Sequence, residues 1–247
     1  MRKGSLGDGS LSYRGNEDNF TSGRALKSGY LRMVSMAVIC KRCVILAHDS
    51  LYSLNDAEQI MGMPAADASW TVEMLDALPD DLQRYEIIDG VLHVTPAPSD
   101  VHQLVAGEFY VRLHAYLRGS RKARAIFSPA DVRRGDRTRN RVQPDVFVVR
   151  LLDGIRPAYP YGLGDLLLAI EVESPSNPAL DYQVKRPLYL REGVEYWIAN
   201  PTARVVSRWK GVKDPGEILS ERIEWRLSTN QEPLVIDIQE LFDEALR

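Results

Sequence analysis

The chain has 247 residues, of which 45% are hydrophobic and 26% are charged, and its formal net charge is -3 at pH 7. This composition is typical of a globular protein and argues against a fibrous one. The small negative charge gives no general attraction to nucleic acid, so binding to a polyanion would depend on a local basic region. Because no apolar run approaches the roughly 18 to 20 residues of a membrane span, we expect a cytoplasmic protein that does not bind membranes.

The first 60 residues differ from the rest of the chain. Gly, Ser, Asn and charged residues dominate residues 1–30, and no apolar period is sustained up to residue 60. We therefore expect a disordered N-terminal extension over residues 1–60. Translation starting at Met61 or Met63, just before the patterned sequence, is one possibility. The folded domain is then expected over residues 63–247.

The two cysteines of the chain, Cys40 and Cys43, stand in "CKRC" with His48 nearby. These residues could form half of a zinc site, but no second pair of cysteines completes four ligands. Two incidental thiols are the simpler interpretation.

Helix and strand signals begin after this extension. Thr71 can cap a short helix. The stretch "RYEIIDGVLHV" then alternates around Asp89 and Gly90, which predicts a β-hairpin. Apolar residues at helical spacing next predict one long helix, with Asp100 as its cap and Gly119 as its stop.

The second half of the chain alternates between strands and helices. A helix is expected to start at Asn177 and Pro178 and to close at Gly193, with a kink at Pro187. A final helix is expected in "IQELFDEAL". Strands are predicted over residues 125–127, 131–133, 146–149, 166–172, 195–199, 204–209 and 222–226. This order predicts the α/β (α+β) class, a sheet with helices on its faces.

Two of these strands carry acidic residues at one end. Asp145 follows Pro144 at the head of strand 146–149, and strand 166–172 contains Glu171 and is followed by Glu173. If the two strands are neighbours, Asp145 and Glu171 can converge at one end of the sheet. Hard divalent ions such as Mg²⁺ prefer such oxygen ligands. The alternative is that each carboxylate simply points to solvent.

The helix after Asn177 carries Asp181, Lys185 and Tyr189 on one stripe, four residues apart. An ion pair between Asp181 and Lys185, with Tyr189 packing at the edge, would explain this spacing. Alternatively, Lys185 reaches the carboxylate pair, where its ammonium can orient a water and offset negative charge that develops on a phosphate.

The order of "PD", "EVESPS", Lys185 and "GVEYWI" resembles the Uma-two family of putative endonucleases, within the PD-(D/E)-x-K restriction-endonuclease-like superfamily. The upstream "WTVEMLDALPDDLQRYEIIDGVLHVTPAPSDVHQ" is similar to the opening pattern of that family, so the resemblance covers most of residues 70–245. It implies a restriction-endonuclease-like central mixed sheet flanked by helices. It also implies a metal-dependent endonuclease that hydrolyses phosphodiester bonds of DNA, with Mg²⁺ or Mn²⁺ as cofactor.

Carried over position by position, the resemblance implies that Asp145 and Glu171 are metal ligands and that Lys185 is the catalytic lysine. It also implies that Glu86 is a further acidic member of the site. Glu173 stands where the simple superfamily motif has a lysine, and Lys185 on the following helix takes that role. Glu173 is a further ligand or a solvent-facing residue, and we favour the second.

Two other side chains are candidates for accessory roles beside Glu173. His102, at the start of the long helix, matches a histidine of the family pattern, although a lone histidine is more often structural than catalytic. Tyr189 is the other candidate, because it shares the stripe of Lys185.

Residues 112–141 form a local basic region, with nine Arg and one Lys against two Asp. A solvated helix end and loop would account for such a run. Beside a metal site, the run favours contacts with phosphates, which position a nucleic acid without reading its sequence. Arg133, Arg134 and Arg137 are the contacts we expect.

The expected partner is nucleic acid, most simply DNA. A homodimer is plausible, since two-fold symmetry suits cutting both strands of a duplex. The alternative function is a non-catalytic nucleic-acid or protein interaction module of the same fold, accessory to a mobile element. Intact Asp145, Glu171 and Lys185 argue against this alternative.

Overall fold

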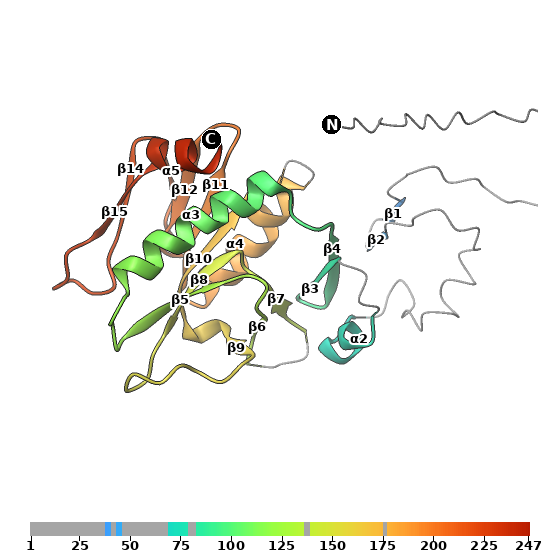
Figure 1. Cartoon of the computed structure of the whole chain (residues 1–247). Coiled ribbons are helices and arrows are strands. Elements are labelled where there is room, and N and C mark those ends of the chain that lie inside the picture. Colours follow the sequence, from blue (N-terminus) through green and yellow to red (C-terminus); the bar gives the residue numbers. More distant parts are fainter. Residues whose placement is uncertain (1–37, 41–42, 46–68, 79–82, 136–138, 175–176) are drawn as a thin grey trace, which may run out of the picture. The chain divides into compact units, whose positions relative to one another are not determined.

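The computed structural model describes residues 38–40, 43–45, 69–78, 83–135, 139–174 and 177–247 (Figure 1). The expected extension over residues 1–60 lies outside the described residues, except for strands β1 (Val38–Cys40) and β2 (Cys43–Ile45). These two strands pair antiparallel, with Cys40 and Cys43 as register partners. His48 lies outside the described residues.

The larger sheet is mixed and has the strand order β13-β12-β11-β10-β8-β5. Its strands are β5 (Ala123–Phe127), β8 (Val146–Arg150), β10 (Leu166–Val172), β11 (Glu195–Asn200), β12 (Val205–Trp209) and β13 (Glu217–Leu219). Strands β10 and β11 pair parallel, and the other neighbours pair antiparallel. The predicted α/β class is confirmed.

The central strands β8 and β10 separate two hydrophobic cores, because alternate side chains of a strand point to opposite faces. On one face, Val148 and Ile170 pack with helices α3 (Asp100–Tyr116) and α5 (Ile238–Ala245). On the other face, Phe147 and Ala169 pack with helix α4 (Arg186–Arg191). In Figure 1, α3 crosses in front of the sheet and α4 lies behind it. Both central strands are therefore fixed from two sides.

The smaller sheet has the order β4-β3-β7-β6-β9. Its strands are β3 (Arg84–Ile88), β4 (Val91–Thr95), β6 (Val132–Arg133), β7 (Arg141–Val142) and β9 (Tyr161–Gly162). The β3–β4 hairpin turns at Asp89 and Gly90, whose φ angles of 50° and 82° both lie in the left-handed region. This confirms the predicted hairpin. Helix α2 (Val72–Asp76) precedes it, and the Thr71 hydroxyl caps α2 by accepting from the Met74 amide.

The segment after Asn177 changes helix type. A π-helix over Leu180–Lys185 continues directly into α4, and the Arg186 amide donates to the Asp181 carbonyl, five residues earlier. Gly193, at φ 76°, follows the helix as predicted. Pro187 lies in the first turn of α4, where its missing N–H costs little. The sequence predicts a kink at Pro187, and the structure instead has a wide helical turn directly upstream of it.

The structure corrects some boundaries. The cap of α3 is Ser99, whose hydroxyl accepts from the His102 amide at 3.3 Å, so the prediction of Asp100 as cap is wrong by one residue. The sequence does not predict β7, β9, β13 or β15 (Leu234–Asp237), which pairs with β14 (Arg222–Trp225). Within the described part of the chain, no helix combines the length and apolar character of a membrane span.

Candidate active site

Strands β8 and β10 place Asp145 and Glu171 at the same edge of the larger sheet. Their antiparallel register pairs Val146 with Ile170, so Asp145, one residue before Val146, lies beside Glu171, one residue after Ile170. The Val172 amide donates to Oδ2 of Asp145 at 2.9 Å. Both carboxylates are almost completely buried, with 2% and 1% of their residue surface exposed. Two buried acids therefore meet where two core strands end.

The smaller sheet contributes a third carboxylate. Glu86 lies on β3 and is buried. Its Oε1 accepts from the Gln143 amide at 2.7 Å, and its Oε2 lies 3.0 Å from the Lys185 amine. The site is thus built between the two sheets.

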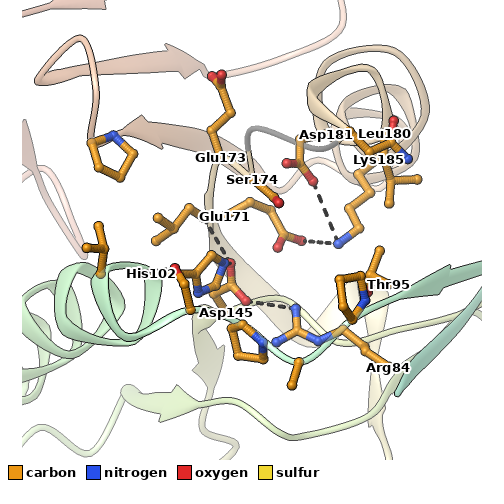
Figure 2. Close-up of a pocket in the computed structure, with 18 of the residues that line it drawn as sticks. Arg84, Thr95, His102, Asp145, Glu171, Glu173, Ser174, Leu180, Asp181 and Lys185 are labelled. Carbon is orange, nitrogen blue, oxygen red and sulfur yellow. Dashed lines mark hydrogen bonds and ion pairs between the residues drawn. The ribbon is translucent and has the colours of Figure 1, made fainter. Parts of the chain in front are cut away.

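Lys185 reaches this cluster from the π-helix (Figure 2). Its Nζ lies 3.1 Å from Oε1 of Glu171 and 3.8 Å from Oδ1 of Asp181. Burial alone would lower the pKa of Lys185. The negative charges of Glu171, Glu86 and Asp181 outweigh burial and raise this pKa above its ordinary value, so the amine is charged.

Asp145 is held by two cationic or hydrogen-donating side chains. Nη1 of Arg84 lies 2.8 Å from its Oδ1, and Nε2 of His102 lies 3.0 Å from its Oδ2. Burial would raise the pKa of Asp145, but the hydrogen bond from His102 and the charge of Arg84 hold it well below its ordinary value. The sequence offered one signal for Arg84: it stands two residues before Glu86 and so on the same strand face.

Glu171 and Asp181 hold their protons more tightly than usual. Burial raises the pKa of Glu171 well above its ordinary value, against the pull of Lys185. Burial also raises the pKa of Asp181, to about 6. Neighbouring negative charges add to both shifts, which indicates that the cluster carries more negative charge than its cations balance.

The two remaining accessory candidates differ in their contacts. The Tyr189 hydroxyl donates to Oε1 of Glu171 at 3.3 Å, and its buried ring stacks on Tyr196 at 5.0 Å between centroids. Glu173 accepts from Tyr182 at 3.1 Å and from Asn200 at 3.0 Å, and its carboxylate points away from Asp145 in Figure 2. Tyr189 therefore contacts the acid cluster, whereas Glu173 is held beside it.

The acidic and basic side chains of the site lie at the base of a cavity of about 550 Å³. They are Arg84, Glu86, His102, Asp145, Glu171, Asp181 and Lys185. The segment Thr95–Ser99 and the pair Pro201 and Thr202 line its more exposed part. A ligand of the buried acids would enter through this cavity.

The chemistry of the site fits a hard divalent cation. Among the described residues, no three His, Cys, Asp or Glu side chains are grouped so as to hold a metal by themselves. Mg²⁺ needs only one or two carboxylates, since waters and substrate oxygens complete its shell, and Asp145 and Glu171 supply these. Two permanent cations, Arg84 and Lys185, face four buried carboxylates. These are Glu86, Asp145, Glu171 and Asp181.

Of the three arginines expected to contact nucleic acid, Arg133 and Arg134 pair with carboxylates outside this cavity. Arg134 Nε lies 2.9 Å from Glu192, and Arg133 lies 3.9 Å from Asp76. Neither side chain lines the cavity. Arg137 lies outside the described residues.

Comparison with known proteins finds similarity to one family model and to solved structures. The model of a family described as "Uma2: Putative restriction endonuclease" matches residues 72–242. The fold is similar to the crystal structure of a putative nuclease belonging to DUF820 from Anabaena variabilis ATCC 29413, with a TM-score of 0.54 and 18% identity over 71% of this chain and 98% of that one. At this identity the likeness shows a shared fold. No curated protein matches the chain.

Proposed function

Because the chain belongs to the Uma2 family, which is described as putative restriction endonucleases, we propose that it is a metal-dependent endonuclease that hydrolyses phosphodiester bonds of DNA. The observation that carries this proposal is the meeting of Asp145, Glu171 and Lys185 at the base of one cavity. The surplus of buried carboxylates over cations supports a site for a further positive charge.

Each residue has a distinct role in this proposal. Asp145 and Glu171 hold Mg²⁺ or Mn²⁺, and a bound cation of this kind acts as a Lewis acid toward a phosphate and activates water. Lys185 orients the attacking water and offsets negative charge on the phosphate. Glu86 fixes the Lys185 amine at 3.0 Å. Arg84 and His102 keep Asp145 ionised and oriented.

Cleavage of plasmid and labelled oligonucleotide DNA by the full chain tests this function. We expect activity with Mg²⁺ or Mn²⁺ and none with EDTA. Asp145→Ala or Glu171→Ala should abolish cleavage, because the ion that activates water is lost. Lys185→Ala should reduce cleavage strongly, and Lys185→Arg should not restore it, since a planar guanidinium places a water differently. Glu240→Gln, an exposed acid on α5, is the control.

Calorimetry of metal binding by each variant separates lost chemistry from lost folding. Wild-type protein that binds DNA and metal but cuts no DNA or RNA with any divalent ion would favour the interaction module instead. Asp145→Ala protein that cuts as well as wild type would show the site assignment to be wrong. Sedimentation with and without duplex tests whether the chain forms a homodimer, whose two-fold symmetry would suit cutting both strands.

A further inference from the structure

The basic side chains of the chain differ in whether a neighbouring carboxylate neutralises their positive charge. Four arginines within residues 112–141 pair with neighbouring carboxylates, which neutralise them. They are Arg112, Arg133, Arg134 and Arg141. A charge already paired at the surface gives a phosphate little additional attraction, because the new contact must replace an existing one.

A second group of cations is exposed and has no carboxylate partner among the described residues. Its members, which we call the distal basic patch, are Arg118, Arg121, Lys122, Arg124 and Arg150. Within the patch, only Arg121 has a side-chain hydrogen bond among the described residues, to the backbone carbonyl of Asp153 at 3.2 Å. The patch therefore keeps its positive charge.

The backbone brings these five residues together. Arg118 follows the last turn of α3, and Lys122 and Arg124 flank the first residue of β5. The Lys122 carbonyl accepts from the Leu151 amide at 2.7 Å, and Arg150 is the register partner of Ala123. The patch thus lies at the edge where β5 begins and β8 ends, with Arg150 on the face of Ala123 and Arg124 on the face of Val149. Asp153 in the neighbouring turn is its acidic neighbour.

The same two strands connect the patch to the candidate active site. Asp145 directly precedes β8 and Arg150 ends it, and five residues of extended chain span roughly 17 Å. Helix α3 makes the same connection, since Ser99 and His102 at its start line the cavity and Arg118 follows its end. Strand β5 is the outermost strand of its sheet in the described part of the chain. Each strand of duplex DNA advances about 3.4 Å along the helix axis per nucleotide, so 17 Å corresponds to about five nucleotides.

We propose that the distal basic patch binds the phosphate backbone of the nucleic-acid substrate about five nucleotides from the bond that is cut. This inference rests on the proposed function, because it takes the substrate of the cavity to be a polyanion. Five cations that form no salt bridge with a described carboxylate, on a chain of net charge -3, supply the local attraction that the whole chain lacks. The patch holds the substrate without reading its sequence.

Binding of the full chain to a fluorescent 24-base-pair duplex, measured by anisotropy in EDTA, tests the patch without cleavage. The variant is Arg118→Gln/Lys122→Gln/Arg124→Gln. The control is Lys210→Gln/Lys213→Gln/Arg222→Gln, which removes the same charge from exposed side chains that form no salt bridge with a described carboxylate. Lys210 and Lys213 follow β12, near the end of the sheet order opposite β5, and Arg222 begins β14, which belongs to the separate β14–β15 sheet.

We expect the patch variant to bind at least about tenfold more weakly and to lower the log-log salt slope by about 2.7, the loss of three phosphate contacts. The control should match wild type. A patch variant with wild-type affinity and slope would overturn this inference and leave the proposed function intact, as would an equal loss in the control. Loss of binding to polyglutamate alone would identify an acidic protein as the partner instead. Wild-type protein that binds no nucleic acid would overturn both proposals.

Discussion

The carboxylate of Asp145 is contacted by groups that are far from it in the sequence. Arg84 on β3, His102 on α3 and the Val172 amide on β10 all contact its two oxygens, at 2.8, 3.0 and 2.9 Å. Because these donors stabilise the anion, Asp145 stays ionised although it is buried. The sequence identifies the carboxylate as a candidate ligand. It does not show that Arg84 and His102 contact Asp145, since their approach depends on the packing of two sheets and a helix.

Loss of Arg84 should destabilise the fold through the carboxylate that it leaves behind. Arg84→Met leaves Asp145 buried without its cation, and we expect a loss of about 3 kcal/mol in the free energy of unfolding. Asp145→Asn in the same chain removes the unpaired charge and should recover part of this loss. Urea denaturation of the two single variants and the double variant measures the coupling. Additive losses would show that the pair contributes nothing.

The raised pKa of Asp181 predicts a dependence of stability on pH. Its pKa is about 6 in the folded protein against an ordinary 3.8, so the folded form binds this proton more tightly than the unfolded chain does. The resulting stabilisation is complete below pH about 4 and is lost as the pH rises through 6. Asp181→Asn cannot ionise and escapes this loss.

We therefore expect Asp181→Asn to equal wild type near pH 4 and to be more stable at pH 7, by at most about 3 kcal/mol. Melting curves in EDTA between pH 4 and 7 measure the difference, with Glu240→Gln as the exposed control. If the two curves run parallel over this range, Asp181 titrates as an ordinary carboxylate.

At the scale of elements, the π-helix sets the direction of the two charged residues that it carries. Asp181 and Lys185 are both buried, and both face the acids of β3 and β10. The wide turn ends at Lys185, directly before Arg186 and Pro187 begin the regular helix α4. A π-turn amounts to one extra residue in an α-helix and is frequent at functional sites. The extra residue rotates Asp181 and Lys185 relative to the buried Leu188 and Tyr189.

Deletion of Gln183, an exposed residue of the π-helix, should convert the wide turn into regular α-helix. Asp181 and Lys185 would then be three residues apart, and one of them would rotate away from the cluster by about 100°. We expect the deletion to lower cleavage at least as much as Lys185→Ala while circular dichroism stays native. Gln183→Ala keeps the length of the helix and should retain activity. Full activity of the shortened helix would show that its turn type does not matter.

Local signals decide which elements the sequence predicts. The β3–β4 hairpin depends on the turn at Asp89 and Gly90, and β10 depends on one apolar run, so both are predictable. Strands β7 and β9 have two residues each and form only because neighbouring strands offer hydrogen bonds. Asp181 and Lys185 of the π-helix are four residues apart in the sequence, which is also the spacing expected on one face of an α-helix. The fold class and the acids of the site are therefore readable from the chain, whereas the wide turn is not.

At the scale of the whole molecule, the candidate site needs most of the described fold at once. The larger sheet supplies Asp145 and Glu171, the smaller sheet supplies Arg84 and Glu86, and the π-helix supplies Lys185. All of these side chains come from residues 84–185, within the part of the chain that the family model matches. Among the residues that the structure describes, none before Arg84 lines the cavity.

We therefore expect that a chain starting at Met63 folds and melts like the full chain. Residues 1–60 show no sustained apolar face to bury, so their removal should expose little hydrophobic surface of the core. Differential scanning calorimetry of both chains compares their melting midpoints, and metal-dependent cleavage checks the site. The cut also removes the β1–β2 pair, which makes the comparison decisive for that hairpin. A midpoint lower by several degrees would show that the hairpin stabilises the domain, because about 1 kcal/mol shifts the midpoint of a domain of this size by roughly 2 to 4 °C.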